Sequence, residues 1–380
     1  MANPFVYGEV VPREAFADRE AEMDRLIADL SAAQKVFLIS PRRYGKSSLV
    51  RQALMTLVRH GALTVDLTIS SYSSYVSFLE GYARALASVE TPAERAREWL
   101  SGVIMSTRPE FGLERDDAGG RFSVAFPAVR TERDINRLAN EVFALPGKLA
   151  AHRRRSVVVA LDEFQAIDAF DGGTVEHALR AAAQQQRAVG YVFAGSEPTL
   201  MEKMIAPRRP FYKAGPVMRL EKIAPAVFAD FIEARFEKSG IQPEAGLGAS
   251  IVELAGNLPY DVQRLAHETW DDVRAGARRQ AGLDDLHTAL ARLLGEQATM
   301  FEAIWQRLTL AQRAVLRAVV LQDGRELLAA DTRVRHRLGG PSSIQASLAA
   351  LIKQDLLLKE GPQYVVVDSL LREWVARKTY

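Results

Sequence analysis

Short runs of apolar residues alternate with segments of helical periodicity through the first 221 residues of the chain. The apolar runs are KVFLIS, ALTVDLTI, SVVVALDEF, VGYVFAGS and PVMRLEKI. Between most of them, apolar side chains recur at intervals of three and four, the period of an amphipathic helix. Apolar strands separated by helices are typical of a parallel sheet that is covered on both faces. The pattern therefore predicts an α/β core over residues 1–221.

One segment inside this region breaks the alternation. The string PEFGLERDDAGGRFSVAF alternates polar and apolar residues on both sides of DDAGG, which is rich in turn-forming residues. Two alternating runs around such a turn predict a β-hairpin over Phe111–Phe126, an insertion near 109–128.

Beyond the core the pattern becomes helical. From Ala224 to about Gln297 every periodic segment has the helical period, which predicts a helical domain over 222–299. From about Phe301 short helices are followed by YVVVD. This order predicts a winged helix-turn-helix domain over 300–380, with Pro341–Gln354 as the recognition helix and Leu356–Val367 as the wing.

Composition narrows the class of protein. A length of 380 residues suits two or three domains of roughly 100–200 residues each. The chain has no cysteine, which excludes disulfides, thiolate zinc sites and cysteine nucleophiles. The net charge of +2 does not indicate a polyanion binder by bulk charge. No apolar run approaches the ~18 residues of a spanning helix, and the start of the chain does not resemble a signal peptide, so we expect a soluble cytoplasmic protein without membrane contact.

The string SPRRYGKSSL matches half of a phosphate-binding loop. Gly45, Lys46 and Ser47 fit the end of the pattern G-x-x-x-x-G-K-[ST], whereas Ser40 stands where the first glycine is usual. The string follows a predicted strand and opens a predicted helix, where backbone N–H groups can hold a phosphate. Lys46 would reach the β- and γ-phosphates, and the Ser47 hydroxyl would bind Mg²⁺. The alternative is a strand–turn–helix that contains GKS by chance.

Two acids at the end of a buried strand favour the nucleotide interpretation. In VVVALDEFQ, Asp162 closes the apolar run and Glu163 follows it. Asp162 would belong to the magnesium shell, and Glu163 would be the general base that polarises the attacking water. The alternatives are an exposed acidic turn, or nucleotide binding without hydrolysis. Two motifs in the correct order, each at the correct end of a strand, favour a complete hydrolytic site.

Other polar residues near these motifs have two interpretations each. Ser196 ends the next strand and either senses the γ-phosphate or belongs to a plain turn. Arg208 and Arg209 form either an arginine finger or a solvated turn. Arg42 and Arg43 contact either phosphate and the nearby acids, or a structural ion-pair partner.

With these residues placed, nearly the whole chain resembles the archaeal-type ATPase family, in the STAND/AAA+ branch of P-loop NTPases. The string FADREAEMDRL is similar to the family's N-terminal box, in which Phe16, Arg19 and Glu20 would pack near the adenine. The strings SPRRYGKSSL, LDEFQ and VFAGS are similar to its phosphate loop, acid strand and sensor strand. GNLPY resembles the Gly-x-Pro signature of the helical lid, with one extra residue between Gly256 and Pro259.

The resemblance implies a P-loop core, a helical lid over 222–299 and a winged helix, with ATP and Mg²⁺ as cofactors. The expected nucleotide-binding residues are Phe16, Arg19, Arg42, Arg43, Tyr44, Gly45, Lys46, Ser47, Ser48 and Pro259. The expected catalytic residues are Lys46, Asp162, Glu163, Ser196 and Arg209, with Ser47 and Asp162 on magnesium. The implied activity is that of an ATP-hydrolysing molecular switch, in which the nucleotide state sets the arrangement of the domains.

Two further functions remain open. One is a DNA-acting AAA+ ATPase, such as a transposition helper or an origin-recognition-like factor, and the other is a non-catalytic DNA-binding regulator. Residues 300–380 carry twelve Lys and Arg against eight Asp and Glu, which suits contact with double-stranded DNA. The candidate DNA contacts are Arg333, Arg335, Arg337, Ser342, Ser343, Gln345 and Ser347. A protein partner or self-association also remains open.

Overall fold

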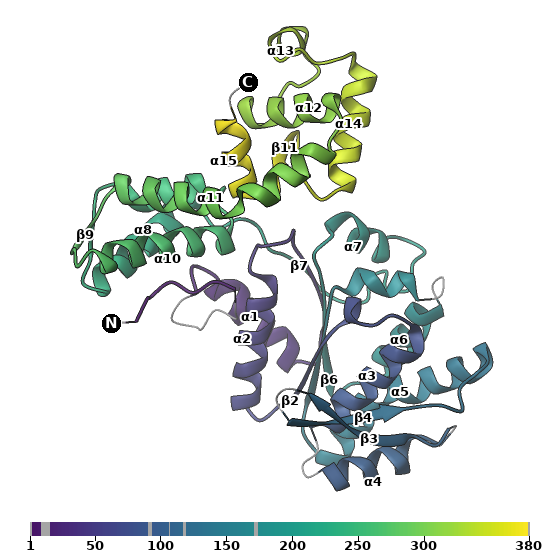
Figure 1. The fold of residues 1–380 in the computed structure, drawn as a ribbon. Helices are drawn as coiled ribbons and strands as arrows, with labels where there is room; N and C mark the ends of the chain where they lie inside the picture. Colours follow the sequence, from purple (N-terminus) through teal and green to yellow (C-terminus); the bar gives the residue numbers. More distant parts are fainter. Residues whose placement is uncertain are drawn as a thin grey trace. The chain divides into compact units, whose positions relative to one another are not determined.

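The computed structural model describes residues 2–8, 16–89, 93–105, 107–116, 119–170 and 174–378. The chain divides into two compact units (Figure 1). One unit, the core unit, is Val10–Glu221, and the other, the C-terminal unit, combines Met1–Glu9 with Lys222–Tyr380. The predicted core of 1–221 therefore differs at its start, because the first residues group with the C-terminal unit.

The core unit contains a five-stranded sheet in the order β2-β5-β6-β1-β7, and all its strand pairs are parallel. This confirms the predicted parallel α/β core. Its strands are β1 (Lys35–Ile39), β2 (Leu63–Thr68), β5 (Val157–Asp162), β6 (Val189–Gly195) and β7 (Val217–Arg219).

Both faces of the sheet are covered by helices (Figure 1). In β5, Val157, Val159 and Leu161 belong to one hydrophobic cluster, and Val158 and Ala160 belong to the other. Successive side chains of a strand point to opposite faces, so a strand buried on both sides is apolar throughout. One face carries α1 (Glu20–Ser31) and α2 (Lys46–Arg59), and the other carries α3 (Tyr75–Ala87), α4 (Ala93–Val103), α5 (Glu132–Arg153) and α6 (Thr174–Gln185).

The predicted hairpin is confirmed. Strands β3 (Glu110–Asp116) and β4 (Gly119–Ala125) pair antiparallel. Val124 and Phe126 are buried in the same cluster as α3 and α5, and Phe111 of β3 packs against that cluster, so the hairpin is anchored to the core through both strands. The remaining short elements of this unit are η2 (Ile69–Ser71), η3 (Phe164–Ala169) and α7 (Pro198–Met204).

The helical part of the C-terminal unit consists mainly of α8 (Pro225–Lys238), α9 (Leu247–Leu254), α10 (Pro259–Ala275) and α11 (Leu283–Arg307). It also contains a short parallel pair, β8 (Gln242–Pro243) with β9 (Gln280–Ala281), which the purely helical prediction missed. Strands of two residues are too short to create a periodic pattern. Helix α11 runs without a break across the predicted boundary between 299 and 300.

The winged-helix prediction is confirmed in its order of elements. The elements are α12 (Leu310–Leu321), α13 (Ala330–Arg335), α14 (Pro341–Lys353), β10 (Leu357–Glu360), β11 (Gln363–Val366) and α15 (Ser369–Arg377). Helix α14 occupies the predicted recognition-helix position, and β10 and β11 form the antiparallel wing. Ser347, predicted as an exposed DNA contact, is wrong in that role because its side chain is buried on α14, which packs against α12.

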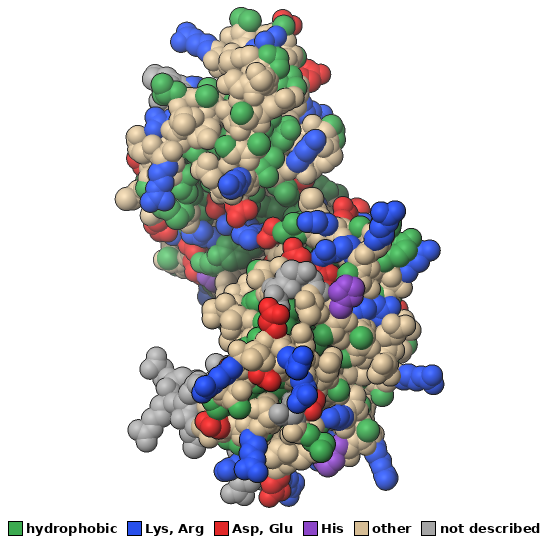
Figure 2. Space-filling model, turned by 90° about the vertical axis from the view of Figure 1, so that its right-hand side faces the viewer, with side chains coloured by type: hydrophobic (Ala, Val, Ile, Leu, Met, Phe, Trp, Pro, Cys, Tyr) green, Lys and Arg blue, Asp and Glu red, His purple; other side chains and the backbone are tan. Residues whose placement is uncertain are grey.

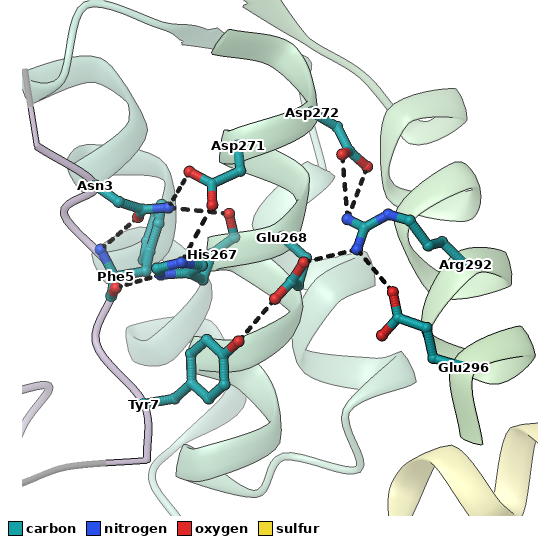
Figure 3. Close-up of polar contacts among 9 residues, drawn as sticks. All are labelled: Asn3, Phe5, Tyr7, His267, Glu268, Asp271, Asp272, Arg292 and Glu296. Carbon is teal, nitrogen blue, oxygen red and sulfur yellow. Dashed lines mark hydrogen bonds and ion pairs between the residues drawn. The ribbon is translucent and has the colours of Figure 1, made fainter. Parts of the chain in front are cut away.

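The first residues of the chain lie along α10 (Figure 3). The Asn3 side-chain amide donates to the backbone oxygen of His267 (3.1 Å), and Nδ1 of His267 contacts the backbone oxygen of Phe5 (2.7 Å). The Tyr7 hydroxyl donates to Glu268 (2.7 Å). Backbone and side-chain contacts at alternate positions therefore fix this segment, residues 2–8, as part of the helical domain.

Helix α11 is tied to the same place by Arg292. Its guanidinium contacts Glu268 (2.9 Å), Asp272 (3.1 Å) and Glu296 (3.4 Å), as Figure 3 shows. Burial raises the pKa of the Glu268 carboxyl, but the Tyr7 hydroxyl and Arg292 outweigh it and lower that pKa overall. Among the residues that the structure describes, no helix is both long and apolar enough to cross a bilayer.

Candidate active site

The loop between β1 and α2 tolerates serine at its entrance. The Ser40 backbone N–H donates to the backbone oxygen of Gly195 on β6 (3.2 Å), so Ser40 still belongs to the edge of the sheet. Left-handed φ values in this loop occur at Arg43 (+68°) and Gly45 (+86°) and not at Ser40. The usual first glycine is therefore not needed for backbone conformation at position 40.

Gly45 is required by its backbone angle rather than by space. A Cβ atom at this position would meet nothing within 4 Å, but its φ of +86° is one that other residues rarely adopt. Gly45 is the N-cap of α2, and no side chain caps that helix. The first N–H groups of a helix have no partner within the helix and attract anions, so this turn is suited to hold a phosphate.

Lys46 and Ser47 converge on one carboxylate. Strand β6 lies between β1 and β5, and side chains at the start of α2 reach the end of β5 across it. Lys46 is only 5% exposed, and its ammonium pairs with Asp162 Oδ1, while the Ser47 hydroxyl donates to Asp162 Oδ2 (2.8 Å). The two halves of the predicted site, which are 116 residues apart in sequence, are therefore in direct contact.

Glu163 is held in a defined orientation beside this pair. Its φ of +52° is left-handed, and its backbone N–H donates to Asp162 Oδ1 (2.9 Å). Its Oε2 accepts hydrogen bonds from the Ser196 hydroxyl (2.6 Å) and from the Gln165 side-chain amide (2.5 Å). Its other oxygen, Oε1, lies 4.0 Å from the Lys46 ammonium.

Gln165 is a site residue that the sequence motifs did not identify. It lies in η3, two residues after Glu163, and is only 7% exposed. A Cβ atom at position 195 would come within 2.4 Å of the Met201 side chain and 2.7 Å of Gln165 Oε1. Gly195 therefore allows Gln165 to approach β6 closely. The signal that could have identified it is the glutamine that ends LDEFQ, a polar residue two positions after Glu163.

Arg209 contacts two acids of its own unit. Its guanidinium lies 2.5 Å from Glu176 Oε1 on α6 and 3.2 Å from Asp168 Oδ1 on η3. Glu176 is 0% exposed, and burial raises the pKa of its carboxyl while Arg209 opposes that effect. Arg208 is exposed, with a left-handed φ of +72°. Arg209 thus links α6 to the helix that follows Glu163, and its role as an arginine finger stays a prediction.

The residues expected near the base of the nucleotide lie beside α1. Phe16 packs on the cluster formed by α1, β1 and α2. Arg19 is buried and donates to Glu22 Oε1 (2.7 Å) and to the backbone oxygen of Glu221 (2.5 Å). Through Arg19, the start of α1 is therefore fixed to the end of the core unit.

The other expected nucleotide contacts differ in exposure. Arg42 and Ser47 are exposed, Arg43 and Ser48 are partly buried, and Tyr44 is buried. Pro259 is the first residue of α10 in the C-terminal unit, and Gly256 before it has a φ of +62°. The proposed contact of Pro259 with nucleotide stays a prediction.

The parallel sheet in this order carries the GKS turn after β1 and two acids at the end of β5, and its fold matches that of ATPases of known structure. Solved structures share the fold over nearly the whole chain. A Walker-type ATPase of Pyrococcus abyssi has a TM-score of 0.63 at 18% identity, covering 98% of this chain and 99% of that chain. The Aeropyrum pernix ORC1 protein in complex with DNA has a TM-score of 0.54 at 13% identity, covering 97% and 94%.

The Aeropyrum pernix ORC2 protein, in ADPNP and ADP complexes, has a TM-score of 0.54 at 13% identity and covers 98% of this chain and 97% of that chain. Residues 299–377 match the family model of a probable winged helix domain. A comparison with curated proteins gives no match. At these identities the likeness to solved structures is one of fold, and it confirms the fold that the sequence resemblance implied.

Proposed function

We propose that this protein binds and hydrolyses ATP with Mg²⁺ and that the nucleotide state sets the arrangement of its domains. The observation that carries the proposal is the convergence of Lys46 and Ser47 on Asp162, with Glu163 adjoining. A chance GKS turn has no reason to contact the acids of a strand two positions away in the sheet. The convergence therefore favours a phosphate site over the two simpler interpretations of these motifs.

The available donor atoms fit magnesium. The Ser47 hydroxyl and the Asp162 carboxylate are hard oxygen ligands, and they are already within 2.8 Å of each other. Magnesium is usually held by one or two carboxylates together with substrate phosphates and waters. In the described part of the chain no three His, Cys, Asp or Glu side chains form a metal cluster, which is compatible with that mode of binding. Mg²⁺ would neutralise charge on the phosphates.

Glu163 is suited to accept the proton of the attacking water. The water oxygen would bond to the γ-phosphorus, the bond to the β-phosphate oxygen would break, and ADP and phosphate would leave. Ser196 and Gln165 both bind Glu163 Oε2, which leaves Oε1 to face the water. Lys46 would bind the β- and γ-phosphates, and the N–H groups at the start of α2 would bind phosphate oxygens.

Contact with double-stranded DNA through the winged helix is a second candidate function. Helix α14 exposes Ser342, Ser343 and Gln345, and Arg335 and Arg337 are exposed just before it. Arginines fix a protein on phosphates, whereas serine and glutamine side chains can reach base edges. The fold neighbour from Aeropyrum pernix, ORC1, was solved with DNA. This observation favours a DNA-acting ATPase over self-association or a protein partner, which would be the alternative outputs of the switch.

The decisive experiment measures ATP turnover with and without duplex DNA. Wild-type protein should hydrolyse ATP, and both Lys46→Ala and Glu163→Gln should abolish turnover. Lys46→Ala should also lose ATP binding, whereas Glu163→Gln should retain it. Lys203→Ala on α7, an exposed lysine, is the matched control and should behave as wild type. A wild-type protein that turns over no ATP in either condition would contradict the proposal.

The two outputs of the switch can be separated. Stimulation of turnover by duplex DNA, lost in an Arg335→Gln, Arg337→Gln double variant, would support the DNA-acting function. A change in protease sensitivity between ATP and ADP that does not depend on DNA would support a switch without DNA. Equal sensitivity in both nucleotides would contradict coupling to domain arrangement.

A further inference from the structure

The segments that enter the sheet meet at its amino edge. Leu63, Val157 and Val189, the first residues of β2, β5 and β6, lie side by side in register. Strand β1 starts beside them at Lys35, which pairs with Tyr191. Because all these strands are parallel, the segments before them lie at one edge, opposite the edge that carries the phosphate loop.

These entering segments are basic and contain no acid. Residues 32–36, 58–63, 148–157 and 180–189 have neither Asp nor Glu. Their eight Lys and Arg residues are Lys35, Arg59, Lys148, Arg153, Arg154, Arg155, Arg180 and Arg187, and the segments also contain His60 and His152. The nearest acid before Lys35 in the sequence is Asp29, which lies 3.8 Å from Arg25. This amino edge therefore carries concentrated positive charge in a chain whose net charge is only +2.

Hydrogen bonds hold the entering segments together. Arg155 donates to the backbone oxygen of Gly61 (2.6 Å), which joins the segments before β5 and β2. Lys35 donates to the backbone oxygen of Gln186 (3.1 Å), which joins β1 to the segment before β6. Burial lowers the pKa of the Lys35 ammonium, and the nearby charge of Arg180 lowers it further. Lys35 and Arg180 are thus close enough to repel each other.

Arginines of the amino edge point to solvent. Arg59, Arg154 and Arg187, one from each of three neighbouring segments, are exposed. Figure 2 shows a face of the molecule on which Lys and Arg side chains are interspersed with Asp and Glu. An arginine guanidinium binds phosphate with a planar pair of N–H groups and is the preferred side chain for nucleic-acid backbones.

We propose that the amino edge of the sheet binds the phosphate backbone of duplex DNA without reading its sequence. Strands lie ~4.8 Å apart, so β2, β5 and β6 spread these arginines over about 10 Å, close to the ~12 Å width of a B-DNA major groove. Among the described residues of the entering segments, Val58 is the one large apolar side chain that is exposed, which offers a lipid surface little to bind. This surface belongs to the core unit, whereas the winged helix belongs to the C-terminal unit.

The test compares two triple variants in the full chain. The edge variant is Arg59→Gln, Arg154→Asn and Arg187→Gln. Asparagine is chosen at 154 because the backbone there is left-handed, with a φ of +52°, and asparagine tolerates that conformation. Arg155 is left unchanged because its side chain donates a hydrogen bond to the backbone oxygen of Gly61. The control variant is Arg130→Gln, Arg133→Gln and Arg137→Gln, three exposed arginines at the other end of α5, beside Glu132 and Asp134.

Binding is measured by anisotropy of a labelled DNA duplex of mixed sequence, without nucleotide, so that the result does not depend on ATP hydrolysis. Each phosphate contact contributes about 0.9 to the slope of log affinity against log salt, so the edge variant should lose roughly 3 in slope and more than tenfold in affinity near 0.1 M salt. The control variant should bind as wild type. Thermal unfolding verifies that all variants are folded.

Three outcomes would overturn the proposal. The first is wild-type protein that does not bind the duplex at low salt. The second is an edge variant that binds the duplex as tightly as wild type, or a control variant that loses as much. The third is binding to vesicles of phosphatidylcholine and phosphatidylserine, lost in the edge variant, without binding to the duplex, because that result would assign the surface to anionic membranes.

Discussion

The Ser196 hydroxyl donates a 2.6 Å hydrogen bond to Oε2 of Glu163. The contact joins the end of β6 to the residue that follows β5, and it fixes one oxygen of the proposed base. The Gln165 side-chain amide donates to the same oxygen. The orientation of Glu163 therefore depends on two neutral donors that come from different elements of the fold.

Removal of the Gln165 amide should slow the chemistry without weakening nucleotide binding. In Gln165→Leu, Glu163 would lose one of its two orienting donors, and we expect kcat to fall by roughly tenfold or more, within the range of general-base effects. KM and the ATP dissociation constant should stay within about twofold. Gln184→Leu, an exposed position on α6, is the control. A rise in KM at unchanged kcat would show that Gln165 acts in binding instead.

Substitution of Gly195 should displace Gln165 and so lower kcat indirectly. The Cβ atom of Gly195→Ala would press on Met201 and Gln165, so we expect Gln165 to move and kcat to fall. The packing and positioning effects can be separated with Gly195→Ala, Met201→Ala, which relieves one of the two contacts. Stability should recover in the double variant more than kcat does. Equal recovery of both would mean that Gly195 matters only for packing.

Loss of the Asp162 carboxylate should destabilise the core unit. Asp162→Ala leaves the buried Lys46 ammonium without its acceptor, and removal of one partner of a buried ion pair costs about 3 kcal/mol. Urea unfolding should therefore show a lower midpoint. Ser47→Ala, which removes an exposed hydroxyl from the same carboxylate, should cost less than about 1 kcal/mol. Equal costs for the two variants would contradict the importance of the Lys46 pair.

Phe5 should anchor the first segment of the chain on the helical domain. Its side chain is 1% exposed, and its ring centroid lies 4.8 Å from that of Phe236. Deletion of a buried phenylalanine side chain costs about 3–5 kcal/mol, so Phe5→Ala should strongly lower the free energy of unfolding of the C-terminal unit. Tyr7→Phe, which removes only the hydroxyl that binds Glu268, should cost about 1 kcal/mol. Differential scanning calorimetry of the full chain measures both changes.

The stability of the C-terminal unit should fall in acid because of Glu268. Its pKa in the folded protein is below that in the unfolded chain, so its contribution is present above the unfolded value of about 4.3. That contribution is lost as the pH falls through the folded pKa. Glu268→Gln should flatten the dependence of the melting temperature on pH below about 4.5. If the melting temperature of this variant fell in acid as steeply as that of wild type, the loss of stability would belong to other carboxyl groups.

The main features of the core could be predicted because they leave a long periodic signal. Buried strands such as β5 are apolar on both faces, and the acids that follow are conspicuous for that reason. The position of Gln165 could not be predicted, because its burial depends on the absence of a side chain at Gly195, on another strand. The exposure of Ser347 was mispredicted for a similar reason. Its environment is set by the helices that pack on α14 and not by its neighbours in sequence.

The role of the chain's first residues was equally hidden from the sequence. Residues 2–8 lack a regular period, and their partners His267 and Glu268 are some 260 positions away. The predicted core of 1–221 included this segment because it comes directly before the first core helix in sequence. Only the hydrogen bonds and the packing of Phe5 show where it belongs.

The docking of residues 2–8 on α10 means that the C-terminal unit is built from two separate stretches of chain. The polypeptide passes between the two units twice, once after Glu9 and once after Glu221. A single proteolytic cut after Glu221 would leave the two units covalently joined by the connection after Glu9. A recombinant fragment that begins at Lys222 would lack Phe5, which covers Phe236 in the full chain. A peptide of the first eight residues, added to this fragment, should bind it and restore the stability of the C-terminal unit.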